Sequence, residues 1–125
     1  MILVDTSVWI DHLHKTVAAL RDELEDGNVL IHPFIVGELA CGEIRRREEF
    51  LHLLSTLPPS VVATDAEALH FIEHHRLMGK GIGFTDVCIL ASVTLTDGAK
   101  LWTRDDRLRA VAIQLHVNFQ SGMSK

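Results

Sequence analysis

Four acidic residues, scattered along the sequence, have the chemistry to hold a divalent metal ion if the fold gathers them. They are Asp5, Glu38, Asp86 and Asp105. Carboxylates in one pocket repel one another and raise each other's pKa values, and a hard cation such as Mg²⁺ relieves that repulsion because it prefers oxygen ligands. Mg²⁺ or Mn²⁺ held in this way polarises a phosphate and lowers the pKa of an attacking water. The set is therefore a candidate centre for phosphodiester hydrolysis.

Gathering these acids requires a particular arrangement of strands and helices. Short apolar strands alternate with longer helical patterns, which predicts a parallel sheet covered by helices on both faces. Strands are expected at 2–5, 29–31, 61–63 and 101–103, with 117–119 as a candidate edge strand, and helices at 17–25, 33–41, 45–57, 66–78, 86–95 and 106–115. The expected helix N-caps are Thr6 or Ser7, Asp65 and Thr85. The predicted fold class is α/β: a single three-layer α/β/α domain over 1–125, with a mostly parallel sheet of four to five strands.

The predicted elements bring the four acids to one edge of the sheet. Ligands of open α/β sheets bind outside the carboxyl ends of the strands. Asp5 closes the first strand and Asp105 follows the fourth, while Asp86 opens a helix. Glu38 lies about one and a half turns into the helix that follows the second strand. A single aspartate in such a place is usually a helix cap or a partner of the helix dipole. The four acids therefore predict a metal site only because they occur together.

Composition limits the classes of function that the chain can have. The protein has 125 residues with 12 Lys and Arg against 17 Asp and Glu, which gives a net charge of −5. A nucleic-acid binder usually carries a basic surface, so a polyanionic substrate would need a bound metal ion to attract it. Cys41 and Cys88 lack paired spacing and are expected to be buried free thiols. No apolar run could cross a bilayer and no signal peptide is recognisable, so we expect a cytoplasmic protein.

Four segments together resemble the motifs of the PIN-domain ribonucleases. They are LVDTSVWID at 3–11, PFIVGELACG at 33–42, FTDVCILA at 84–91 and LWTRDDRL at 101–108. Their order and spacing, and the total length, are similar to those of the VapC-type toxins of toxin–antitoxin pairs. The likeness extends over about 2–119, nearly the whole chain.

The resemblance implies roles for individual residues. Asp5 and Asp86 would be the principal metal ligands, and Glu38 and Asp105 would complete the acidic cluster, with Asp105 binding the metal directly or through water. Small hydroxyl residues beside these acids would orient the carboxylates or a water. They are Thr6, Ser7 and Thr103. The position after Asp105 is often basic in the family and is Asp106 here, so Asp106 could compete as a ligand.

The resemblance also implies an activity and partners. The activity would be Mg²⁺-dependent endoribonuclease cleavage of RNA, with Mn²⁺ as a substitute, leaving a 5′-phosphate and a 3′-hydroxyl. The partners would be a second copy of the chain, in a homodimer, and a cognate VapB-type antitoxin whose C-terminal segment fills the acidic groove. No membrane partner is expected.

Two other classes of protein compete with this interpretation. A PIN-like module could bind RNA or protein without cleaving, although the complete acidic set argues against lost catalysis. A phospho-acceptor receiver domain also holds Mg²⁺ on strand-end acids, but it needs an acidic pair at the first strand, an Asp ending the third and a Lys ending the fifth. Here the first strand ends in the single acid Asp5, and the third is followed by Thr64.

Three further motifs were weighed against structural explanations. His70, Glu73 and His74 match the H-x-x-E-H pattern of inverted zinc peptidases, but a third ligand is missing and an ordinary helix flank explains them better. The glycine-rich stretch 79–83 lacks the Ser or Thr of a phosphate-binding loop, which leaves Lys80 as a weak candidate for a phosphate contact. The basic run 45–47 is followed by Glu48 and Glu49, which favours local ion pairs.

Overall fold

The computed structural model describes residues 1–121, so residues 122–125 of the expected domain lie outside the described range. Strands and helices alternate through most of the chain. In order they are β1 (Ile2–Val4), α1 (Thr6–His14), α2 (Ala18–Glu25), β2 (Val29–Leu30), α3 (Pro33–Ala40), α4 (Arg47–Ser55), α5 (Asp65–His75), α6 (Phe84–Leu95), β3 (Lys100–Trp102) and α7 (Asp106–Gln114).

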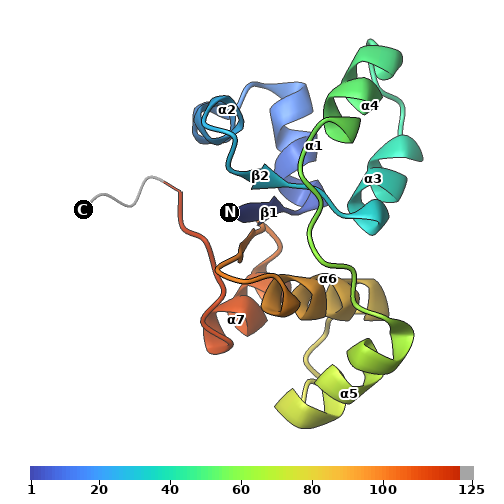
Figure 1. The fold of residues 1–125 in the computed structure, drawn as a ribbon, viewed down its shortest axis with the longest axis vertical. Coiled ribbons are helices and arrows are strands. Elements are labelled where there is room, and N and C mark those ends of the chain that lie inside the picture. The colour runs from blue at the N-terminus through green and yellow to red at the C-terminus, as the bar shows by residue number, and fades with distance from the viewer. Residues whose placement is uncertain (122–125) are drawn as a thin grey trace.

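A parallel sheet in the order β2-β1-β3 forms the centre of the molecule. Ile2 pairs with Val29 on one side and with Lys100 on the other. Helices α1 to α4 cover one face of this sheet and α5 to α7 the other, which gives the predicted three layers (Figure 1). The first strand lies between its two neighbours, so the residues that follow β1 and β3 leave the sheet side by side.

The sheet has three strands in residues 1–121, where four to five were expected. The segment 61–63 is not a strand: Val61 and Val62 are 47% and 46% exposed. The backbone N–H of Val61 donates to the side chain of Thr96, the C-cap of α6, and that of Ala63 donates to Ser92 of α6. Pairing beyond the three strands is limited to two isolated parallel bridges, Ile31 with Pro59 and Leu101 with Asn118. The second bridge is what remains of the expected edge strand at 117–119.

Helix α6 is the central helix of the core. Its residues from Val87 to Val93 are all buried, because the helix packs between the sheet and α5. A helix that is apolar all round is stable only when it is enclosed in this way. Cys88 is among the buried residues, whereas Cys41 is exposed, so the expectation of two buried thiols holds for one of them. Both cysteines are free.

The helix caps differ from the expected ones by one or two residues. Asp5, Thr64 and Gly83 have the extended backbone of an N-cap and precede α1, α5 and α6. Thr64 forms a reciprocal capping box with Glu67. The residues expected as caps lie instead inside the first turns of these helices. None of the helices within residues 1–121 is both long and apolar enough to cross a membrane.

Candidate functional site

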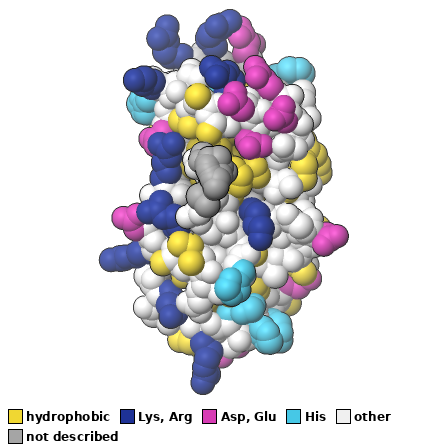
Figure 2. Space-filling model, turned by 90° about the vertical axis from the view of Figure 1, so that its left-hand side faces the viewer, with side chains coloured by type: hydrophobic (Ala, Val, Ile, Leu, Met, Phe, Trp, Pro, Cys, Tyr) yellow, Lys and Arg dark blue, Asp and Glu magenta, His cyan; other side chains and the backbone are white. Residues whose placement is uncertain are grey.

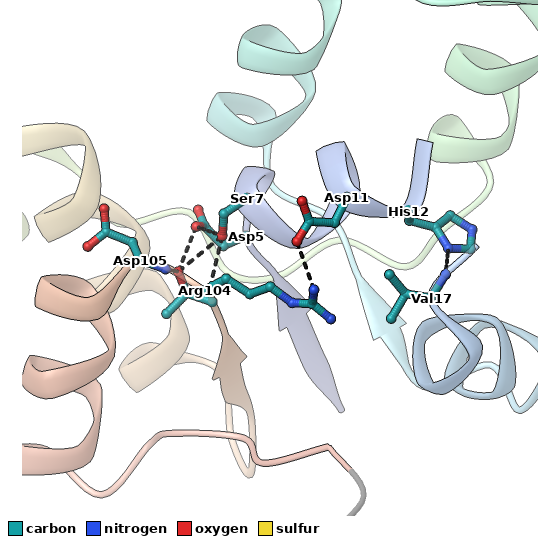
Figure 3. A network of polar contacts seen from close by, with 8 residues as sticks. Asp5, Ser7, Asp11, His12, Val17, Arg104 and Asp105 are labelled. Atoms are coloured by element: carbon teal, nitrogen blue, oxygen red, sulfur yellow. Dashed lines mark hydrogen bonds and ion pairs between the residues drawn. The ribbon is translucent and has the colours of Figure 1, made fainter. Parts of the chain in front are cut away.

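Asp5 is the most tightly held acid of the predicted set. It follows β1, is 8% exposed, and its backbone N–H donates to the carbonyl of Trp102 at the end of β3 (2.8 Å). Its Oδ2 atom accepts hydrogen bonds from the hydroxyls of Ser7 and Thr103, both at 2.8 Å (Figure 3). Oδ1 accepts no hydrogen bond within residues 1–121. One carboxylate oxygen is therefore saturated by the protein and the other is free for a ligand.

The two hydroxyls that hold Asp5 are themselves held by the backbone. Ser7 Oγ accepts from the N–H of Arg104 (3.0 Å), and Thr103 Oγ1 accepts from the N–H of Asp105 (3.1 Å). Each hydroxyl has a single hydrogen, which it donates to Asp5, so their mutual contact of 3.3 Å is not a further hydrogen bond. This network joins the end of β1 to the β3–α7 junction and fixes the orientation of the Asp5 carboxylate.

Asp105 caps a helix and also contacts the network around Asp5. As the N-cap of α7, its Oδ1 accepts from the backbone N–H of Leu108 at 2.9 Å. Its own N–H bonds Thr103, which also bonds Asp5. The structural explanation for an aspartate at a helix start thus applies here, and the cap places Asp105 beside the Asp5 network (Figure 3).

Asp86 is influenced by the charges of the three other acids. It lies half-buried in the first turn of α6. Burial raises the pKa of its carboxyl, the charge of Asp5 raises it further, and those of Asp105 and Glu38 add smaller increases, against a lowering by a hydrogen bond from the Gly83 backbone. Acidic side chains from four segments that are far apart in sequence therefore lie close enough to influence one another around Asp86.

Glu38 reaches this region from the opposite layer. It is an exposed residue of α3, and its Oε1 accepts a hydrogen bond of 2.6 Å from Thr6 Oγ1 in the first turn of α1. Its apolar sequence neighbours Val36 and Leu39 therefore do not bury it; the helix turns Glu38 outward. The Thr6 contact holds its carboxylate near the end of β1.

The acids have the chemistry that a hard divalent cation prefers, but they do not form a complete set of ligands around one point. All the donors are carboxylate oxygens, and the mutual repulsion at Asp86 is what a cation would relieve. Within residues 1–121, however, no three His, Cys, Asp or Glu side chains lie close enough to bind one ion together. Mg²⁺ suits such an open arrangement because it keeps several waters and needs only one or two protein carboxylates.

Comparison with known proteins identifies the fold family. The family model described as "PIN domain" matches residues 2–114. The chain belongs to the PIN domain family. The resemblance inferred from the four sequence motifs is thus confirmed.

Two comparisons place this PIN domain among known proteins. "Ribonuclease VapC32" of Mycobacterium tuberculosis, found in two strains, is 46% identical over 114 residues, covering 91% of this chain and 92% of the relative. The crystal structure of PAE2754 from Pyrobaculum aerophilum covers 92% of this chain and 88% of its own, with a TM-score of 0.56 and 18% identity. The second likeness concerns the fold alone, which agrees with the predicted α/β class.

A buried histidine that the sequence reasoning overlooked supports the α3 side of this PIN domain. His32 is fully buried, and its Nδ1 caps α3 by accepting from the N–H of Phe34 (3.0 Å). Because Nδ1 is an acceptor, the hydrogen of the neutral ring is on Nε2, which donates to Ser92 Oγ of α6 (3.0 Å). Burial lowers the pKa of His32 and keeps it neutral. Its position directly before Pro33, at a helix start, is the sequence feature that indicates a cap.

An ion pair beside the acidic cluster was also missed. Arg104 Nη1 lies 2.7 Å from Asp11 Oδ2, across from the β3–α7 junction to α1 (Figure 3). Both residues fall inside the motif segments, but their spacing of 93 positions conceals the contact in the sequence. Both side chains are about half exposed.

The remaining motifs have structural explanations in this PIN domain. The rings of His70 and His74 stack on α5 with centroids 5.7 Å apart, and no third ligand joins them within residues 1–121. In the basic run, Arg46 pairs with Glu49 at 2.8 Å, which is the expected kind of local ion pair. Arg47 instead donates to the backbone carbonyls of Ala40, the last residue of α3, and Gly42.

Proposed function

We propose that the chain is a metal-dependent endoribonuclease that hydrolyses RNA phosphodiester bonds and acts as the toxin of a type II toxin–antitoxin pair. The observation that carries the proposal is the convergence of negative charge from Asp5, Glu38 and Asp105 on the half-buried Asp86. The PIN domain match and the 46% identity to a protein named ribonuclease support the same activity.

In this proposal Asp5 and Asp86 would bind Mg²⁺ directly, with Mn²⁺ as a substitute, Asp105 would bind the ion through water, and Glu38 would complete the catalytic set. The bound ion supplies a Lewis acid for the scissile phosphate and lowers the pKa of the attacking water. Ser7 and Thr103 keep Oδ1 of Asp5 directed at the site by occupying Oδ2. Thr6 orients the Glu38 carboxylate, which can then accept a proton from the water.

Asp105, rather than its neighbour, is the acid assigned to the site. Asp106 forms an ion pair with Arg109 one turn further along α7, and its side chain is 88% exposed. Asp105 is the residue linked through Thr103 to Asp5. This contrast supports Asp105 as the fourth member of the set and leaves Asp106 outside it.

Several further properties belong to the same proposal. A cognate VapB-type antitoxin would inhibit the enzyme by covering the acidic site, and the enzyme would work in the cytoplasm as a homodimer. The receiver-domain alternative is set aside by the PIN domain match. The non-cleaving alternative is distinguished only by an activity measurement.

That measurement is cleavage of a mixed cellular RNA pool by the purified protein in Mn²⁺ or in EDTA. We expect discrete fragments with 5′-phosphate ends in Mn²⁺ and none in EDTA. Asp86→Asn should abolish them, whereas Asp97→Asn, which alters an exposed aspartate after α6, should cleave as the wild type does. Fragments that persist in EDTA, or undiminished in Asp86→Asn, would refute the metal site. Intact RNA in every arm would favour a binding module.

A further inference from the structure

A polar pocket lies on the far side of the network that holds Asp5. It has a volume of about 380 Å³ and is lined by Trp102, Thr103, Arg104, Arg109, Asn118 and Phe119, with the two residues that follow. Thr103 is the residue whose hydroxyl donates to Asp5 Oδ2. Thr103 therefore lines the pocket and also contacts the acidic cluster, so the two lie next to each other. The pocket's volume is in the range of small-ligand sites.

The pocket combines two positive charges in a chain that is negative overall. Arg104 and Arg109 both line it, although the protein has a net charge of −5. Each arginine has an aspartate partner, Asp11 for Arg104 and Asp106 for Arg109. Ion pairs with such exposed side chains are weak, so a phosphate can replace either carboxylate. Arginine is well suited to phosphate because its planar fork donates two parallel hydrogen bonds.

The pocket also offers a partner for a nucleobase. Asn118 Oδ1 is buried and finds no hydrogen-bond donor within residues 1–121. A buried acceptor without a donor is unfavourable, and rotation of the amide toward an entering amino group would satisfy it. The half-buried ring of Phe119 packs on Trp102, with the ring centroids 5.1 Å apart, and provides an apolar wall nearby. Amide side chains recognise adenine by pairing with its amino group and N7.

We propose that this pocket binds one unpaired nucleotide of the RNA substrate, adjacent to the bond that is cut. Its phosphate would contact Arg104 and Arg109, and an amino group on its base would donate to Asn118 Oδ1. The base must be unpaired because, in an A-form RNA duplex, the edge that carries the adenine amino group and N7 lies in a deep, narrow major groove that side chains cannot enter. This inference rests on the proposed ribonuclease function and assigns it a preference for a base that carries an amino group.

The test is titration of the full-length, ¹⁵N-labelled protein in EDTA with adenosine 5′-monophosphate (AMP) or uridine 5′-monophosphate (UMP), followed by NMR. We expect AMP to shift the side-chain signals of Asn118 and Arg109 and to bind more tightly than UMP, whose base has no amino group. Arg109→Gln should weaken both nucleotides roughly tenfold, as expected for a charge-assisted hydrogen bond. Asn118→Ala should remove the difference between AMP and UMP.

The matched control is Arg107→Gln, which removes the same charge from α7 at a residue that does not line the pocket. It should leave both affinities unchanged. Equal binding of AMP and UMP by the wild type, or shifts of the same size with inorganic phosphate, would overturn the nucleotide assignment. Because no turnover occurs in EDTA, an RNA-cleaving enzyme without these shifts would refute the pocket alone. Shifts in a protein that cuts no RNA would refute the ribonuclease alone.

Discussion

Asp5 accepts two hydroxyl hydrogen bonds on a single oxygen, and this arrangement does more than satisfy a buried acid. Both donors bind the same carboxylate oxygen and prevent the carboxylate from rotating. A catalytic carboxylate has to be held in orientation by its neighbours, because a displaced ligand atom loses much of its effect. Ser7 and Thr103 therefore deserve separate tests from the acids that they support.

Thr103→Val removes one of these hydroxyls while keeping the shape of the side chain. We expect unfolding to become easier by about 1–2 kcal/mol, because Asp5 loses a donor and the N–H of Asp105 loses its acceptor. RNA cleavage should fall by roughly tenfold to a hundredfold, the range for an outer residue that orients a ligand. Urea unfolding and initial cleavage rates measure the two effects. Thr94→Val, which removes a hydroxyl bonded only to a helical carbonyl, should retain full activity.

Asp86→Asn should stabilise the metal-free protein at neutral pH. Burial and the neighbouring acids raise the pKa of Asp86 above its unperturbed value of 3.8. Between pH 3.8 and the raised pKa, the folded state therefore binds more protons than the unfolded state. Stability therefore falls as pH rises through this range and stays lower above it. Removing the charge should raise Tm in EDTA at pH 7 by roughly 3 °C and flatten the acid side of the pH profile.

The same variant supplies a thermodynamic readout of metal binding. Mg²⁺ should raise the Tm of the wild type, because an ion that binds only the folded state stabilises it, and should have little effect on Asp86→Asn. A lower Tm for Asp86→Asn in EDTA would show that its charge is compensated within the protein. The sequence made this residue recognisable by its motif, but the Coulomb effect of three distant acids on it depends on the fold.

At the scale of helices and strands, a buried hydrogen-bond chain joins the start of α3 to α6. His32 donates to Ser92, and Ser92 donates in turn to the carbonyl of Cys88 while accepting from the N–H of Ala63. Every polar atom in this chain has a partner, which a buried group requires. It positions α3, which carries Glu38, relative to α6, which carries Asp86.

His32→Asn should keep the cap of α3 and break this link, because asparagine caps helices but is too short to reach α6. We expect a loss of about 1–3 kcal/mol of stability at pH 7. Burial lowers the pKa of His32 below 6.5, so wild-type stability is lost as pH falls below 6.5, where the unfolded state takes up the proton. As pH falls below 6.5, the free energy of unfolding measured in urea should decrease less for this variant than for the wild type. His52→Asn, at an exposed histidine, should leave the slope unchanged.

The sequence predicted the elements that carry the site better than those that do not. The strands that lead to Asp5 and to Thr103, β1 and β3, are short apolar runs, and they pair as parallel neighbours in the sheet. The segment 61–63 has the same β-branched composition, yet two of its backbone N–H groups bond side chains of α6 and its C-cap, and Val61 and Val62 are exposed. Composition alone does not reveal which partner a backbone N–H will find. The contact between Asp11 and Arg104 depended equally on tertiary structure.

Over the whole molecule, positive and negative side chains are interspersed rather than separated. On the face shown in Figure 2, Lys and Arg side chains extend from the top down the left-hand edge to the bottom, and Asp and Glu side chains, most numerous at the upper right, also occur on both sides further down. With a net charge of −5 there is no general attraction for RNA, and the acids of the site repel it directly. An ion bound as proposed would neutralise those acids and should increase the affinity for RNA.

RNA binding should consequently tighten with divalent metal in the wild type and lose most of this metal dependence when the acids are removed. We expect Mn²⁺ to tighten binding of a short fluorescent single-stranded RNA by the wild type roughly tenfold over EDTA, measured by anisotropy in the cold with the RNA checked for integrity. Replacing two aspartates, Asp5→Asn with Asp86→Asn, reduces the net charge from −5 to −3. This variant should bind RNA more tightly than the wild type in EDTA and gain little from Mn²⁺. An equal gain from Mn²⁺ in both proteins would mean that the ion acts on the RNA and not at the acidic cluster.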